Sequence, residues 1–172
     1  MSFDAWLILD SLPKLLAGLA LTLELLLLSA VLGLLLAVLL LLMRISGRWY
    51  LVVPAFAYCF LFRGTPLLVQ LFVIYYGLPQ FEAVRDSALW PLLREPFGCT
   101  VLALMLNTGA YVAEILRGGV LGVDKGLHEA GKALGLGAVH RFVYVTAPIA
   151  VRIAIPAYTN DVVSLLKATA LA

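Results

Sequence analysis

The sequence has few charged residues, few cysteines and few histidines, and each shortage excludes a class of protein. Only 13% of the residues are charged, whereas 63% are hydrophobic. A water-soluble domain of 172 residues cannot bury that much apolar surface and still cover itself with polar groups. Two cysteines and two histidines, separated in the sequence, give no disulfide framework and no metal site. The composition therefore predicts an integral membrane protein.

Long hydrophobic runs predict membrane-spanning helices. Leu25–Met43 contains nineteen residues, and Ser29 is its only polar side chain. At about 1.5 Å per residue this run nearly crosses a hydrocarbon core of about 30 Å. The N-terminus lacks the basic region and cleavage site of a signal peptide. The last span is still apolar at Ala172, so we expect a chain that is a fragment or stops early. The predicted spans are 19–43, 54–78, 97–116 and 153–172.

The charges between the spans predict an orientation. Arg44 and Arg48 follow the first span without nearby acids, and the loop 117–152 carries five basic against two acidic residues. The loop 81–95 has three acidic and two basic residues. The positive-inside rule puts the first two regions in the cytoplasm, so the N-terminus and the loop 81–95 face outward.

Polar side chains near the middle of three spans are candidate functional groups. Gln70, Asn107 and Asp161 lie about 16, 15 and 12 Å from the starts of their spans. An ionisable group at such depth costs about 2.5–3.5 kcal/mol, so Asp161 is a functional candidate. Its carboxylate either contacts a cationic ligand or pairs with another span or a second subunit. Asn160 and Ser164 share one face of the same helix.

The sequence Arg-Gly-Thr-Pro at 63–66 interrupts the second span. Pro66 removes a backbone donor and frees carbonyl groups near residue 62, so the helix must kink or restart there. Two interpretations remain open. The broken helix contributes to a midplane site, with Thr65 among its residues, or Arg63 reaches the cytoplasmic interface and Thr65 caps a new helix.

The loop between the third and fourth spans contains a short amphipathic helix. Glu129 lies on its polar side, and the small residues of its apolar side allow a partner to approach closely. A helix of about ten residues is marginal alone in water, so we expect a partner to hold it. The apolar stripe consists of Leu127, Ala130, Gly131 and Leu134.

Other local features have simpler explanations. Gly126–Ala133 fits Gly-x-x-x-x-Gly-Lys, but alanine follows the lysine and no strand precedes it, so we expect no ATP binding here. His128 and His140 are expected to be solvated loop residues. Glu114 and Arg117, three residues apart, are expected to form a local ion pair.

The same loop resembles the EAA loop of ABC-importer permeases: Glu-Ala-Ala, three residues, Gly, nine residues, Ile-x-Leu-Pro. Glu129, Ala130, Gly135 and Pro148 occupy the expected positions, and Gly131 replaces the third motif residue. Three further stretches resemble the polar-amino-acid permease family, and the last two most resemble its branch for basic amino acids (histidine, lysine, arginine, ornithine) and opines (octopine, nopaline). The stretches are FRGTPLLVQLFVIYYGLP at 62–79, TVLALMLNTGAYVAEILRGG at 100–119 and IPAYTNDVVSLLKATALA at 155–172.

The resemblance implies an all-α bundle of transmembrane helices with about five spans, of which this chain ends in the fourth. Residues 1–172 would form a single permease domain, truncated at its C-terminus, with a cytoplasmic coupling loop at about 118–150. The coupling residues would be Glu129, Ala130, Gly131 and Gly135. The substrate path would contain Asp161, which balances a cationic substrate, together with Asn160, Ser164, Asn107, Gln70 and Thr65.

The resemblance also implies partners and a function. The chain would be a permease subunit for polar, basic amino acids or opines in a bacterial inner membrane, and not an enzyme. An ABC ATPase would bind ATP and Mg²⁺, whereas this chain would bind no cofactor. A second permease subunit and a periplasmic binding protein would complete the importer, with no role for nucleic acid. The alternative is a truncated or repurposed permease copy that acts as a non-transporting membrane interaction protein.

Overall fold

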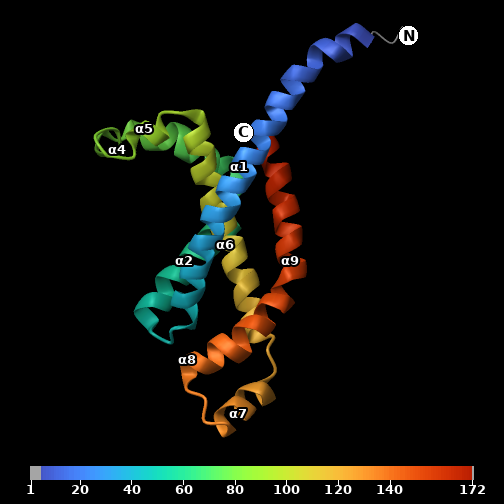
Figure 1. Ribbon diagram of the computed structural model, residues 1–172. Coiled ribbons are helices and arrows are strands. Elements are labelled where there is room, and N and C mark those ends of the chain that lie inside the picture. The colour runs from blue at the N-terminus through green and yellow to red at the C-terminus, as the bar shows by residue number, and fades with distance from the viewer. Residues whose placement is uncertain (1–4, 172) are drawn as a thin grey trace.

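The computed structural model describes residues 5–171, with side chains described for residues 12–170. Within that range every regular element is a helix (Figure 1), which confirms the all-helical prediction. The N-terminal end, which the charge pattern assigns to the outside, lies outside the described residues. The elements are α1 (Ala5–Ile45), α2 (Trp49–Gly64), α3 (Leu67–Phe72), η1 (Val73–Gly77), η2 (Leu78–Gln80), α4 (Glu82–Arg85), α5 (Trp90–Leu93), α6 (Pro96–Leu121), α7 (Lys125–Ala133), α8 (Ala138–Arg141), η3 (Phe142–Thr146), α9 (Ala147–Ala168) and η4 (Thr169–Leu171).

Within the described part of the chain, three helices are long and apolar enough to cross a membrane: Leu12–Ile45, Pro96–Leu121 and the continuous helix Ala138–Ala168. The bent pair Trp49–Gly64 and Leu67–Gln80 provides a fourth span if its two halves are taken together, although they meet at 105°. Each predicted hydrophobic segment therefore corresponds to a helix or a broken helix. Many leucines of α1 are exposed on its surface, as expected for side chains that face lipid.

The fourth span starts earlier than the sequence predicts. We expect it near Ile153, but the helix is already continuous from Ala138. The reason is local: the π-helical turn η3 ends just before Pro148, which stands in the first turn of α9. A proline in a regular helix loses one hydrogen bond and clashes with the preceding turn, and a wider turn relieves that conflict. Pro148 therefore does not end the helix.

Helix α6 is central and packs against α1, α2 and α9 (Figure 1). The contact with α1 is close, because a Cβ on Gly109 would lie 2.7 Å from Leu36 Cδ2. Beside it, Val112 and Cys59 are fully buried in the main apolar cluster. Cys59 and Cys99 are both free and buried, so they serve as packing residues of the interior.

The loop end of the bundle is held by charge and by close backbone packing. Glu114 Oε2 accepts from Arg117 Nε at 2.9 Å, which confirms the predicted local pair. Glu114 also pairs with Arg44 of α1 at 2.5 Å, a contact over 70 residues that helical spacing does not reveal. One turn further along α6, a Cβ on Gly119 would overlap the carbonyl oxygen of Ala150, so α6 and α9 cross here in direct contact.

Candidate functional site

The site begins at the break between α2 and α3. Helix α2 ends at Gly64, and Thr65 and Pro66 are extended before α3 starts. The Thr65 hydroxyl donates back to the Leu61 carbonyl at 2.9 Å and does not cap α3. Arg63 lies over the ring of Tyr111 at 5.4 Å. These contacts agree with the broken-helix interpretation, and the interpretation of Thr65 as the cap of a new helix is wrong.

Gln70 satisfies the carbonyl groups that the break leaves free. Its Nε2 donates to the carbonyl of Phe62 at 2.8 Å and to that of Thr65 at 3.0 Å. Its Oε1 accepts from Asn107 Nδ2 of α6 at 3.2 Å. Buried polar groups need such partners, because an unsatisfied one costs about 1–3 kcal/mol. Gln70 and Asn107 therefore meet as the sequence predicts, and Gln70 fixes the shape of the broken helix.

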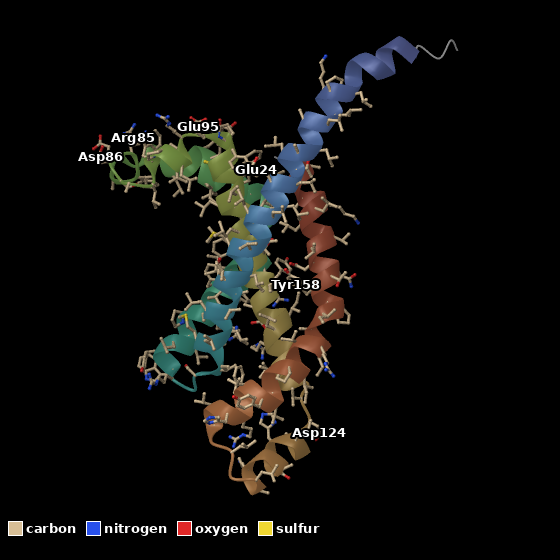
Figure 2. The ribbon with its side chains drawn as sticks, viewed as in Figure 1. Glu24, Arg85, Asp86, Glu95, Asp124 and Tyr158 are labelled. Carbon is tan, nitrogen blue, oxygen red and sulfur yellow. The ribbon has the colours of Figure 1, made fainter. Side chains whose placement is uncertain are left out.

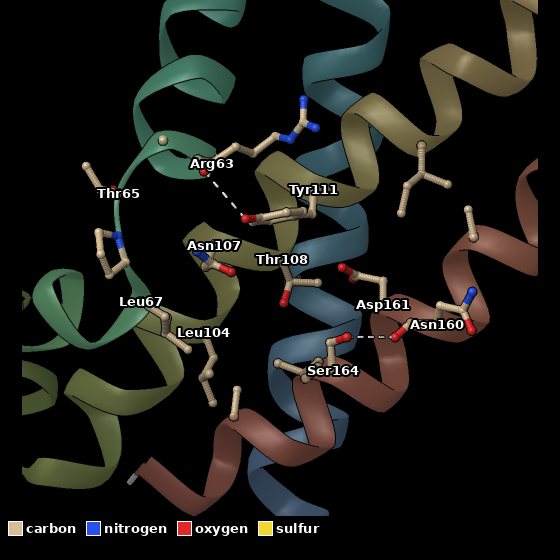
Figure 3. Close-up of a pocket in the computed structure, with 16 residues that line it drawn as sticks. Arg63, Thr65, Leu67, Leu104, Asn107, Thr108, Tyr111, Asn160, Asp161 and Ser164 are labelled. Carbon is tan, nitrogen blue, oxygen red and sulfur yellow. Dashed lines mark hydrogen bonds between the residues drawn. The ribbon is translucent and has the colours of Figure 1, made fainter.

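A cavity of about 660 Å³ lies between the break, α6 and α9 (Figure 3). This volume falls within the range of pockets that bind small molecules. Five of the six predicted substrate-path residues line this cavity, and the sixth, Gln70, does not. The five are Thr65, Asn107, Asn160, Asp161 and Ser164.

Asp161 is the main charged group of the α9 wall. Figure 3 shows its carboxylate directed from α9 toward α6. Its Oδ2 atom is buried and has no hydrogen-bond partner in the described part of the chain. The ion pairs found among the described residues do not include Asp161. The pairing with another span of this chain, which the sequence left open, is therefore not formed within residues 12–170.

The α6 wall contains residues that the sequence argument missed. Thr108 and Tyr111 also line the cavity, and the Tyr111 hydroxyl donates at 3.5 Å to the carbonyl of Arg63, a lining residue at the end of α2. The signal was present, because Asn107 and Tyr111 are four residues apart and so share one helical face. Depth alone selected only the most polar member of that face.

The coupling loop has a defined structure. Asp124 Oδ1 accepts from the Gly126 N–H at 2.8 Å and caps the start of α7. At the other end of α7, Gly135 has a φ of +75°. Its backbone N–H donates to the Lys132 carbonyl at 2.9 Å, and the backbone N–H of Leu136 donates to the Gly131 carbonyl at 3.0 Å. This pair of bonds is a Schellman motif, which requires a left-handed residue at this position. Gly135 therefore has a conformational role.

The predicted coupling residues differ in accessibility. Glu129 and Ala130 are exposed, but Gly131 is buried beneath the returning chain. A Cβ on Gly131 would lie 3.1 Å from Arg141 Cδ, so its close neighbour belongs to the same loop. His140 is exposed as predicted. His128 is not freely solvated, because its Nε2 lies 3.2 Å from Thr146 Oγ1.

Comparison with known proteins gives consistent matches. Residues 29–172 match the family described as binding-protein-dependent transport system inner membrane component. The octopine transport system permease protein OccM of Rhizobium radiobacter is 49% identical over 172 residues, which cover 100% of this chain and 70% of OccM. The nopaline transport system permease protein NocM of Agrobacterium fabrum is 45% identical over 170 residues, which cover 98% of this chain and 70% of NocM.

A further relative and a solved structure agree. The histidine/lysine/arginine/ornithine transport system permease protein HisM of Escherichia coli is 44% identical over 156 residues, which cover 90% of this chain and 66% of HisM. The crystal structure of an amino acid ABC transporter with histidines superimposes with a TM-score of 0.85 at 34% identity. That match covers 99% of this chain and 76% of the other.

Proposed function

The chain belongs to the family of binding-protein-dependent transport system inner membrane components, and on this basis we propose that it forms the path for cationic amino acids or opines in an ATP-driven importer. It is a multi-pass membrane protein and a transport subunit, not an enzyme. Membership of this family implies an ATPase and a binding protein as partners. The same membership gives no support to a non-transporting role.

The single observation that supports the substrate class is the buried Oδ2 atom of Asp161 on the cavity wall, which has no hydrogen-bond partner among the described residues. A carboxylate in low dielectric requires a cation or several hydrogen bonds. A guanidinium, ammonium or imidazolium group of a substrate would meet that requirement. Asn160, Ser164 and Asn107 would supply neutral hydrogen bonds around it, and this set matches what the relatives' names say of their own substrates.

The test compares arginine-stimulated ATP hydrolysis and arginine uptake by the assembled importer in proteoliposomes. A hydrogen bond to a charged group is worth about 1.5–3 kcal/mol, so Asp161→Asn should lower both by roughly tenfold or more. Asp161→Glu keeps the charge and should retain part of the response. Glu24→Gln, which changes an exposed carboxylate of α1, is the control. An Asp161→Asn importer with the wild-type response contradicts the site, and a wild type without response to arginine, lysine, histidine or octopine contradicts the substrate class.

For the partners, we propose that an ABC ATPase, which holds ATP and Mg²⁺, contacts α7 through Glu129 and Ala130. Gly131 and Gly135 would give the loop the shape that the ATPase recognises, and this chain itself would hold no cofactor. A second permease subunit, identical or different, would complete the path, and a periplasmic binding protein would deliver the substrate. The exposure of Glu129 and Ala130 on a capped helix supports the contact.

For the orientation, we propose that Arg44, Arg48 and the loop 117–152 face the cytoplasm and that the loop 81–95 faces outward. The charge distribution supports this assignment. In Figure 2, Arg85, Asp86 and Glu95 lie at the opposite end of the molecule from Asp124, so the two loops would meet different compartments.

A further inference from the structure

The coupling loop and the cavity wall share one helix. The segment Ala138–Ala168 is continuous through α8, η3 and α9. Its first turns belong to the loop beside α7, and its later turns carry Asn160 and Asp161 on the cavity wall. Figure 1 shows this helix rising from the loop end of the molecule alongside α6. A movement of its first turns would therefore be passed toward the cavity along one continuous helix, through the π-helical turn η3 and past Pro148 and Pro156.

A hydrogen bond joins α7 to this helix. His128 Nε2 lies 3.2 Å from the hydroxyl oxygen of Thr146, whose side chain is buried with 2% exposed. His128 Nδ1 lies 3.4 Å from the Asp124 carbonyl, so in the neutral ring Nδ1 donates and Nε2 accepts from Thr146. In the protonated ring, Nε2 donates to Thr146, which then donates to the Arg141 carbonyl at 3.5 Å. Both protonation states keep the link.

A second contact supports the first. The Arg141 side chain lies over Gly131 of α7, and its Nη1 donates to the Leu136 carbonyl at 3.4 Å. Both contacts fall on the returning helix within α8 and η3. The π-helical turn η3 ends at Thr146, and π-helical turns occur frequently at functional positions. Helix α7 is therefore attached to the start of the long helix at two places.

The direct crossing with α6 supplies a pivot. Gly119 contacts Ala150, and a Cβ added to it would also lie 3.3 Å from Ala154 Cβ. From Ala150 the helix extends about 6 Å to Thr146 and about 16 Å to Asp161. Thr146 and Asp161 therefore lie on opposite sides of this crossing, with Pro156 between the crossing and Asp161, so a tilt about the crossing would move both ends of the helix.

We propose that His128 and Thr146 are positioning residues that transmit movement of α7 to the cavity wall, with Gly119 of α6 as the pivot. This proposal rests on the proposed function, because it requires an ATPase to engage α7. ATPase closure would push α7, the bond between His128 and Thr146 would pass the displacement to the long helix, and Asp161 would move on the far side of the pivot.

The test measures movement rather than transport, so that it does not depend on the identity of the substrate. An environment-sensitive fluorophore on Val163→Cys, an exposed position of α9 beyond the pivot, reports the difference in emission between ATP and ADP in the purified importer. Cys59 and Cys99 are buried, and the unmodified chain gives the labelling background. Thr146→Val and His128→Leu remove the bond, whereas Thr146→Ser and His128→Gln keep a polar group at the same place. Thr159→Val, an exposed threonine of the same helix, is the matched control.

We expect Thr146→Val and His128→Leu to lower the emission difference by about fivefold, within the range for residues along a coupling network. The copurified ATPase should remain at the wild-type level, and the serine, glutamine and Thr159→Val variants should respond like the wild type. If either disruptive variant retains the full difference with ATPase bound, the link is wrong. A wild-type chain that captures no ATPase contradicts the proposed function and, with it, this link.

Discussion

Glu114 stabilises the loop end of the bundle by holding two arginines at once. It binds Arg117 of its own helix and Arg44 of α1, with side chains only 11% exposed for Arg44 and 15% for Glu114. Arg44 also lies over the ring of Phe56 at 5.1 Å. Since removal of one partner leaves a buried charge uncompensated, Glu114→Gln should cost roughly 3 kcal/mol of stability, the low end for a buried ion pair. Thermal unfolding in detergent should show a melting temperature lower by several degrees.

Glu95→Gln is the control for this prediction, because Glu95 and Arg94 form a surface pair in which both side chains are 62% exposed. Such a pair contributes about 0–1 kcal/mol, so the control should unfold close to the wild-type temperature. Equal melting temperatures for Glu114→Gln and the wild type would mean that water solvates the guanidinium groups of Arg44 and Arg117 well enough to replace the carboxylate. The structural role of Glu114 would then be refuted.

Single residues also explain how far the sequence predicts the cavity. Asp161 and Asn107 could be predicted as functional residues, because a polar group deep in a hydrophobic segment is costly to insert and is therefore usually functional. Gln70 met the same criterion, but its side chain is used by the backbone of the broken helix. Tyr111 could not be selected by depth, since its aromatic body is common in membrane spans. Residue spacing alone does not show which polar side chains line the cavity and which hold the broken helix together. That distinction requires the 105° bend between the two helices, which the sequence does not reveal.

At the scale of elements, α7 is the part that most directly tests the loop interpretation. Glu129 is exposed near the middle of a helix that is capped at both ends, so its substitution should leave the helix intact. Glu129→Arg places a positive charge in the proposed contact, and like-charge or mismatched contacts at an interface cost several kcal/mol. We expect the amount of copurified ATPase to fall by about tenfold or more, since 1.4 kcal/mol already corresponds to a factor of ten.

Asp86→Arg makes the same charge reversal on the exposed loop 81–95 and provides the comparison. The ATPase should copurify with this variant as with the wild type. Quantitative mass spectrometry of the detergent-solubilised complexes measures both amounts. Retention of the ATPase by Glu129→Arg at the wild-type level would remove Glu129 from the contact.

Elements differ in how well the sequence predicts them. The hydrophobic runs predicted four segments, three of which are helices long enough to span and one of which is a bent pair of helices, because burial in lipid requires length and apolarity. They did not predict that the last helix starts at Ala138, because the charged residues Arg141 and Arg152 interrupt the apolar run before Ile153. For the same reason the sequence did not predict a hydrogen bond between His128 and the last helix. Its partner Thr146 lies in a turn that the sequence assigned to a loop.

At the scale of the whole molecule, orientation determines whether the two ends meet the proposed partners. The loop around α4 and the loop around α7 lie at opposite ends (Figure 2), and Ala88 and Lys132 are exposed in them. We expect a membrane-impermeant maleimide to label Ala88→Cys in intact spheroplasts, and Lys132→Cys only after permeabilisation, because the more basic loop is retained inside. Cys59 and Cys99 are buried, so the unmodified chain should give little background. Labelling of Lys132→Cys from outside would leave α7 beyond the reach of a cytoplasmic ATPase.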